Sequence, residues 1–209
     1  MSRAALVLAL TLVLGLPASV AGNPGSGETL VVVGMHNQVK KKAWRDQRLG
    51  MGIRGRLTQM YADSGAFALL EDRHLAPSVQ EAVNSYWLSE GQPQSGDLAA
   101  LLEETGADWV AYGDLTYLGM ARSRVTGVIS GRSWTYRAQV NLCIRGSVGA
   151  ALCRTGEAKS TTRVVGAVIE FRGDDNVAFD QAGPAEAIDQ ALVEAFNTLM
   201  PEWERTHAS

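Results

Sequence analysis

The sequence predicts an α/β protein, in which one mixed β-sheet of about five strands is flanked by helices and followed by a C-terminal helix. Three observations support this fold class. Short apolar runs alternate with segments of helical period in the first half of the chain. From Thr116 onward the segments become longer, extended and alternating. A single amphipathic stripe then returns near the C-terminus.

The first half of the chain opens on a strand. Residues 30–33 are a continuous apolar, β-branched run bounded by Gly34, as expected for a strand that is buried on both faces. A polar and basic loop follows. The next apolar residues recur at helical spacing and predict one buried helix face before Gly65: Ile53, Leu57, Met60 and Tyr61. Residues 67–70 predict a second, short strand.

Two helices and a strand come next. Pro77 stands where a helix can begin, and apolar residues at helical spacing follow it: Val79, Ala82, Val83 and Tyr86. Asp97 can cap a short helix that carries three leucines, and Gly106 can close it. Residues 109–112 then predict a further strand.

The second half of the chain predicts antiparallel pairing. Apolar and polar residues alternate strictly over residues 136–145, which is the pattern of a half-buried strand, and residues 151–165 are expected to pair back onto it. Pro184 opens the last helix, which we expect to stop at Pro201. Its apolar stripe consists of Ile188, Leu192, Ala195, Phe196 and Leu199.

The N-terminus predicts export. Arg3 is followed by an apolar run over residues 4–16 and by Ser19 and Ala21, which fit the cleavage site of a secretory signal peptide. We therefore expect a signal peptide over 1–21, a flexible leader over 22–28 and a single domain over 29–205. No Cys follows the signal segment, so a lipid anchor is not expected there. We therefore expect a periplasmic location, and association with the outer membrane stays open.

The chain has 209 residues, a net charge of −3 and 46% hydrophobic residues, which excludes a disordered chain, a collagen and a polybasic nucleic-acid binder. Nucleic acid is also not expected as a partner outside the cytoplasm. Without the signal peptide, in which Arg3 is the only charged residue, the net charge is −4. No later stretch is apolar enough for a membrane helix, although peripheral membrane association stays open.

The only two cysteines, Cys143 and Cys153, are predicted to form a disulfide. If the turn between the two strands centres on Val148, the two positions face each other across a hairpin, and exported cysteine pairs normally oxidise. Two buried thiols are the alternative.

Charge is unevenly distributed. Between Lys40 and Arg56 the chain has seven basic residues and one acid, whereas between Glu170 and Arg205 it has nine acids and two bases. We hypothesise that the basic loop, with Trp44 as an apolar anchor, meets the acidic region of a neighbouring copy head to tail. The candidate partner-binding residues are Lys40, Lys41, Lys42, Trp44, Arg45, Arg48, Asp174, Asp175 and Glu194. Two solvated surfaces, or neutralisation within one molecule, are the alternatives. An anionic membrane surface or a cell-wall polymer is another target for the basic loop.

Catalytic and metal-binding patterns are weak. Ser130 lies one position late for a nucleophile elbow, and the three histidines, His36, His74 and His207, lack metal-ligand spacing and predict loop or surface roles. Asp174, Asp175 and Asn176 with Asp180 could hold calcium, but they lack the EF-hand spacing and its closing Glu, and a solvated acidic loop is the simpler interpretation. We expect no enzyme activity, cofactor or metal.

Several short segments in order resemble the curli secretion channel (CsgG-like) superfamily. They are residues 30–33, 52–57, 64–73, 105–113, 139–142 and 155–157, and together they span most of the mature chain. The superfamily includes envelope assembly factors, the lipoprotein activator of penicillin-binding proteins and domains of flagellar accessory proteins. The resemblance implies the same α/β fold and no catalytic role for the Gly-Ala-Asp segment at 106–108 or the Thr-Gly-Glu segment at 155–157.

Two departures from that superfamily matter. The chain lacks the acceptor Cys of many relatives, and the stretch 120–134, with Arg122, Arg124 and Arg132, is short and charged for a membrane hairpin. We therefore expect a member outside the pore-forming branch.

The resemblance implies a non-enzymatic assembly protein of the bacterial cell envelope that binds other envelope proteins in secretion or surface-structure assembly. A regulatory module for a cell-wall synthase, or a flagellar accessory protein, is the alternative. A hydrolase that uses the acidic loop with His36 or His74 is a third hypothesis.

Overall fold

A computed structural model describes residues 27–88, 95–125, 131–165 and 183–207. They form a five-stranded mixed sheet in the order β2-β1-β3-β4-β5. The strands are β1 (Thr29–Asn37), β2 (Ala68–Leu69), β3 (Trp109–Val125), β4 (Gly131–Gly146) and β5 (Leu152–Val165). β1 runs parallel to β2 and β3, whereas β3, β4 and β5 are antiparallel neighbours. The predicted fold class is confirmed.

The described residues also form four α-helices and three short 3₁₀ turns. The helices are α1 (Gln47–Ser64), α2 (Pro77–Ser85), α3 (Ser95–Thr105) and α4 (Pro184–His207). The 3₁₀ turns are η1 (Lys42–Trp44), η2 (Asp72–His74) and η3 (Tyr86–Leu88). α3 begins at Ser95, so Asp97 lies inside its first turn and does not cap it. Gly106 closes α3 at φ +66°, which glycine adopts at little cost.

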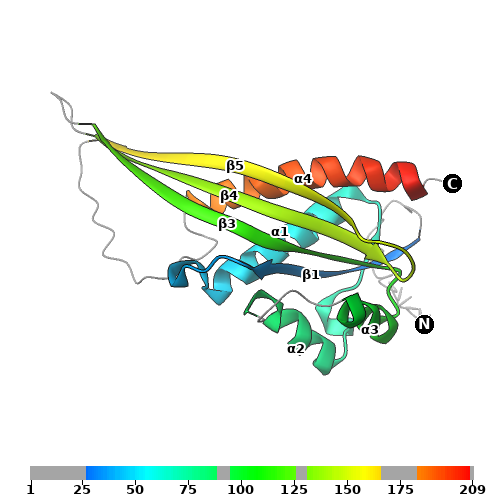
Figure 1. The fold of residues 1–209 in the computed structure, drawn as a ribbon. Coiled ribbons are helices and arrows are strands. Elements are labelled where there is room, and N and C mark those ends of the chain that lie inside the picture. Colours follow the sequence, from blue (N-terminus) through cyan, green and yellow to red (C-terminus); the bar gives the residue numbers. More distant parts are fainter. Residues whose placement is uncertain (1–26, 89–94, 126–130, 166–182, 208–209) are drawn as a thin grey trace, which may run out of the picture.

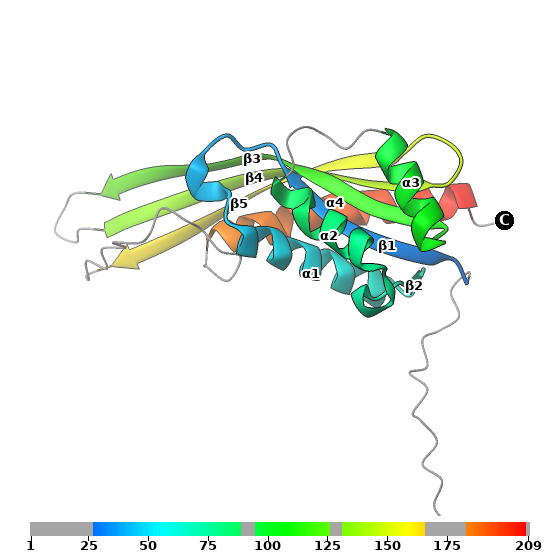
Figure 2. The ribbon, with the colours of Figure 1, turned by 90° about the horizontal axis from the view of Figure 1, so that it is seen from below.

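The helices cover the two faces of the sheet in pairs (Figures 1 and 2). α1 and α4 pack on one face, where their apolar stripes share a core with alternate residues of the strands, such as Val32, Ala111 and Leu142. α2 and α3 pack on the opposite face with Val31 and Val110. This alternation is the expected consequence of the two-residue period of a strand.

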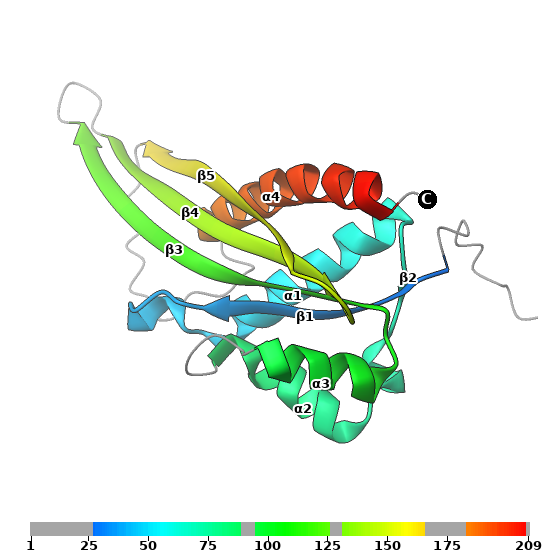
Figure 3. The ribbon, with the colours of Figure 1, turned by 45° about the vertical axis from the view of Figure 1, so that its right-hand side comes forward.

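The ends of β3, β4 and β5 project past the end of β1 (Figures 1 and 3). We call this part the blade, and it comprises the paired residues 117–125, 131–139 and 157–165. β3 and β4 have 17 and 16 residues, so they extend well into the stretch 120–134. The expectation that this stretch is short for a membrane hairpin is therefore wrong, because both strands extend far beyond it.

Two further predictions are wrong. α4 does not stop at Pro201 but continues to His207, because Trp203 is buried there against Phe67 and Trp109. His36 does not lie in a loop: β1 continues past Gly34, which has φ +106° and lies at a register shift, so His36 is a buried strand residue.

Candidate partner-binding surface

The basic loop between β1 and α1 is held by buried groups. The Asn37 side chain is 4% exposed; its Nδ2 donates to the Trp44 carbonyl oxygen at 2.6 Å, and its Oδ1 accepts from the Val39 N–H at 2.9 Å. The Trp44 side chain is 3% exposed and belongs to the main core. Trp44 therefore anchors the loop to its own protein, and the expectation that it anchors a partner is wrong.

The cations of this loop point outward. Lys40, Lys41, Lys42 and Arg45 are exposed, and none of them forms an ion pair with a carboxylate in the described residues. The Lys41 ammonium lies 5.1 Å from the centre of the Trp44 ring. Arg48 differs, because its guanidinium pairs at 3.0 Å with Asp46, the residue that caps α1. The structure thus presents four cations on a fixed loop.

Some acids of the C-terminal region have partners within the described part of the chain. Asp189 pairs with Arg56, which belongs to the basic segment itself, and Glu202 pairs with Arg154. Glu194 accepts a hydrogen bond from the Glu157 backbone N–H at 2.8 Å. Asp174 and Asp175 lie outside the described residues. Neutralisation within one molecule therefore accounts for part of the asymmetry, and the head-to-tail contact stays a hypothesis.

The blade carries side chains that the sequence analysis did not name as candidate partner-binding residues. Tyr117 is 49% and Met120 46% exposed. The Arg122 guanidinium lies 5.9 Å from the centre of the Trp134 ring. The Tyr117 ring covers Gly119, where an added Cβ would lie 2.2 Å from the Tyr117 Oη. Exposed apolar positions at the end of an alternating strand were the available sequence signal.

The face of β4 and β5 opposite α4 is a polar ladder. Arg137 pairs with Glu157, and the Thr135 and Thr161 hydroxyls lie 3.1 Å apart. Cys143 and Cys153 stand directly opposite each other on this face and form the predicted disulfide, with Cα atoms 4.1 Å apart. The disulfide ties β4 to β5 at the end that lies away from the blade.

His36 and Asp114 form the nearest approach to a catalytic pair. The His36 Nδ1 lies 3.4 Å from the Asp114 Oδ1, and the side chains are only 7% and 10% exposed. Burial raises the pKa of the Asp114 carboxyl, while hydrogen bonds from Gln38 and His36 oppose that rise. Tyr86 covers the pair, with its ring centre 6.2 Å from that of His36. The two side chains are buried under η3, which indicates a structural polar pair.

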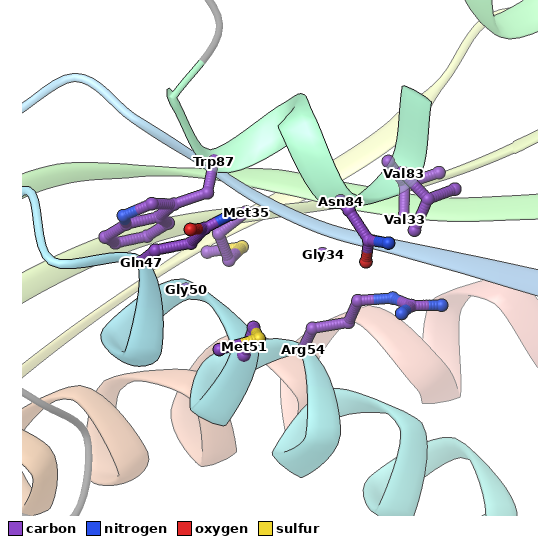
Figure 4. A pocket seen from close by; sticks show the side chains of 10 residues that line it. All are labelled: Val33, Gly34, Met35, Gln47, Gly50, Met51, Arg54, Val83, Asn84 and Trp87. Carbon is purple, nitrogen blue, oxygen red and sulfur yellow. The ribbon is translucent and has the colours of Figure 1, made fainter. Parts of the chain in front are cut away.

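A shallow pocket lies along the outer side of β1, between α1 and α2 (Figure 4). The Gly34 backbone forms its floor, and Met51, Asn84 and Trp87 are on its walls. Arg54 borders the pocket, but its Nε donates to the Val32 carbonyl at 3.0 Å and its guanidinium pairs with Asp72. Arg54 therefore closes the strand edge and is not available to a ligand.

No cluster of metal-ligating side chains occurs in the described residues, and His74 is exposed in η2. In the same part of the chain, no helix is long and apolar enough to cross a membrane.

Comparisons with known proteins find similarity to solved structures. No family model and no curated protein match it. The C-terminal domain of LpoB from Salmonella enterica is 13% identical, with a TM-score of 0.40 over 64% of this chain and 82% of that domain. The PelC dodecamer from Paraburkholderia phytofirmans is 14% identical, with a TM-score of 0.38 over 84% of this chain and 89% of PelC.

The lipoprotein GNA1162 from Neisseria meningitidis is 12% identical, with a TM-score of 0.37 over 84% of this chain and 99% of that protein. At these scores the likeness supports no inference about binding or activity.

Proposed function

We propose that this protein is an exported, non-enzymatic assembly or scaffold protein of the bacterial cell envelope, which binds partner proteins in a secretion or surface-structure assembly complex. The observation that carries the proposal is the composition of the blade surface. Tyr, Met, Arg and Trp are enriched at protein interfaces, and the blade carries Met120, Arg122 and Trp134 on one face and Tyr117 on the other.

The expected location supports the same proposal. The N-terminal residues have the pattern of a cleaved signal peptide, and a disulfide between Cys143 and Cys153 suits an oxidising compartment such as the periplasm. Fractionation by osmotic shock, with the mass of the mature chain measured, tests this location. A mature N-terminus at Gly22 is expected, and a cytoplasmic chain that retains Met1 would contradict export.

Partner identity separates the proposal from its alternatives. A photo-cross-linking amino acid at Met120 should capture a component of a secretion or surface-assembly system in intact cells. The matched control position is Glu103, which is exposed on α3 and distant in the fold from the blade. Capture of a penicillin-binding synthase or a flagellar protein would favour the regulatory or accessory role instead, and equal capture at both positions would argue against a specific surface.

The hydrolase hypothesis has a direct test at His36. His36→Ala should leave cross-linking at Met120 unchanged if the protein acts by binding. Loss of a hydrolytic activity on an envelope substrate in this variant, with thermal stability retained, would support the hydrolase instead.

A further inference from the structure

Among the described residues, the outer edge of β3 has no strand partner beyond Leu115. β1 pairs with β3 up to the contact between Asn37 and Leu115, whereas β3 continues to Val125. In the part of the chain that the structure describes, no strand lies beside this second half of β3. Beyond the end of β1 the chain continues into the basic loop and η1, while β3 curves away from the line of β1 (Figure 3).

The backbone groups on the outer side of this second half of β3 follow from the alternation of the ladder. The Glu157 N–H bonds to Glu194 and therefore points to the outer side of β5, away from β4. Even-numbered residues of β5 must then bond to β4, and through the observed registers Gly119 and Ala121 bond to β4. The N–H and C=O groups of Met120 and Arg122 consequently point outward.

The register shift between Leu115 and Tyr117 explains why the outward backbone groups belong to odd-numbered residues of β3 before the shift and to even-numbered residues after it. Before the shift, the Leu115 carbonyl also points away from β4, and it accepts a hydrogen bond from the Gln38 N–H at 3.1 Å. The outward side of β3 is thus occupied at Leu115, and from Leu118 onward no strand of the described ranges pairs with it.

The two edges of the blade differ in protection. On β5, the Glu194 carboxylate occupies the N–H of Glu157, and Arg154 donates to the Cys153 carbonyl at 2.5 Å. Lys159 also lies on this edge, and natural sheets use such lysines and covering contacts to prevent strand addition. On the β3 edge from Leu118 to Ser123 there is no Pro or Lys, and Met120 is exposed.

Charge selects the kind of strand that fits. The second half of β3 starts beside the basic loop, because Gln38 is bonded to Leu115. The loop carries the four outward cations Lys40, Lys41, Lys42 and Arg45, and the exposed Arg122 lies on the edge strand itself. A second copy of β3 would bring Arg122 toward this positive surface and would be repelled, whereas acidic side chains would be attracted.

We propose that an extended, acidic segment of a partner protein adds as a strand to the outer edge of β3, paired with the backbone of Met120 and Arg122 and neutralised by the basic loop. This inference deepens the proposed function and rests on it. Main-chain hydrogen bonds supply the affinity in strand addition, and side-chain contacts supply the specificity. Acidic residues are therefore expected at every second position of the added segment, on the side near the loop.

Proline substitution tests the edge directly. Met120→Pro removes one outward N–H, and proline is tolerated on edge strands when its missing N–H faces solvent. Met120→Ala keeps the N–H and removes the same side chain. Thr161→Pro removes an outward N–H from the opposite edge of the blade and is the matched edge control. Unchanged thermal midpoints are required of all three variants.

The probes are two fluorescein-labelled octapeptides, one alternating Val and Glu and the other alternating Val and Lys. The Val–Glu peptide should bind the mature protein and the Met120→Ala and Thr161→Pro variants. Met120→Pro, and Lys41→Glu combined with Lys42→Glu, should each weaken binding by about tenfold. Hydrogen exchange at the Met120 and Arg122 amides should slow when the peptide is added, and raising the salt from about 50 to 300 mM should weaken binding.

Several results would overturn the assignment. Equal binding by Met120→Pro and Met120→Ala would show that the β3 edge is not used, and equal binding of the Val–Lys peptide would remove the acidic specificity. A dimer that Met120→Pro dissociates would identify a second copy as the occupant. Absence of peptide binding together with specific cross-linking at Met120 would refute strand addition and leave the proposed binding function standing.

Discussion

Substituting Gly156 by alanine should separate α4 from the sheet. Gly156 lies where β5 passes under α4, and an added Cβ would be 2.0 Å from the Ala191 carbonyl oxygen and 2.7 Å from the Ala195 nitrogen. A carbon atom normally stays about 3.3 Å from a carbonyl oxygen, so the helix and the strand would have to move apart by roughly 1 Å. Both atoms belong to the helix backbone, and no side-chain rotation relieves the contact.

The cost follows from what α4 buries. The inner face of α4 carries the fully buried residues Ala191, Leu192 and Leu199, so displacing the helix loosens the main core. Overpacking costs about 1 to 3 kcal/mol, and we expect the upper end because backbone atoms collide. For a domain of this size, about 3 kcal/mol corresponds to a fall of about 6 to 12 °C in the thermal midpoint.

The matched control is the same substitution at Gly55, in the middle of α1. An added Cβ there has no other atom within 4 Å, so alanine should stabilise the helix by about 0.5 to 1 kcal/mol. Differential scanning calorimetry of both variants should give shifts of opposite sign. A Gly156→Ala midpoint equal to that of the unsubstituted protein would refute the close approach of α4 to β5.

Three further substitutions have defined outcomes. Replacing Cys143 and Cys153 by alanine removes a crosslink between residues ten positions apart. Calorimetry should show that the free energy of unfolding falls by about 2 to 3 kcal/mol, and reductant should lower that of the unsubstituted protein by the same amount. A smaller effect would mean that the pair is not oxidised. Asp114 has a raised pKa in the folded state, so its contribution to stability falls as pH rises above 3.8. Asp114→Asn should therefore raise the midpoint more at pH 7 than at pH 4, and a parallel shift at both would contradict this. Trp203→Ala should cost about 3 to 5 kcal/mol in urea unfolding, because its ring centre lies 4.4 Å from that of Phe67; a loss below about 1 kcal/mol would mean that α4 ends near Pro201.

Periodicity made much of the fold predictable. The strict alternation over residues 136–145 and the apolar stripe of α4 each have one buried and one polar face, and both elements formed where the pattern indicated. The blade part of β3 escaped this reasoning because both of its faces are partly exposed. Met120 and Arg122 lie on the same face of the strand and yet differ in polarity, whereas residues on one face of a half-buried strand usually share it.

Local signals misplaced two residues because tertiary contacts overrode them. Gly34 resembled the end of a strand, yet its positive φ accommodates an irregularity, and the strand continues to the buried His36. Trp44 resembled an exposed anchor within a charged loop, yet the core takes its ring. Neither outcome can be derived from composition, since each depends on which segment packs against the residue.

The candidate site is less predictable than the fold because it depends on which strands lie at the edge of the sheet. Whether Met120 or Thr161 lies on a free edge depends on strand order, and strand order depends on where a distant parallel strand ends. The charge asymmetry illustrates the same limit: Arg56 and Asp189 are 133 residues apart, and their ion pair removes both from the set available to a partner. After such internal pairing, the four cations of the basic loop have no carboxylate partner among the described residues, and they border the blade edge whose backbone no other described group covers. An acidic strand therefore satisfies two independent deficits at one place, unpaired backbone and uncompensated charge, whereas a neutral strand or a compact acidic surface would satisfy only one of them.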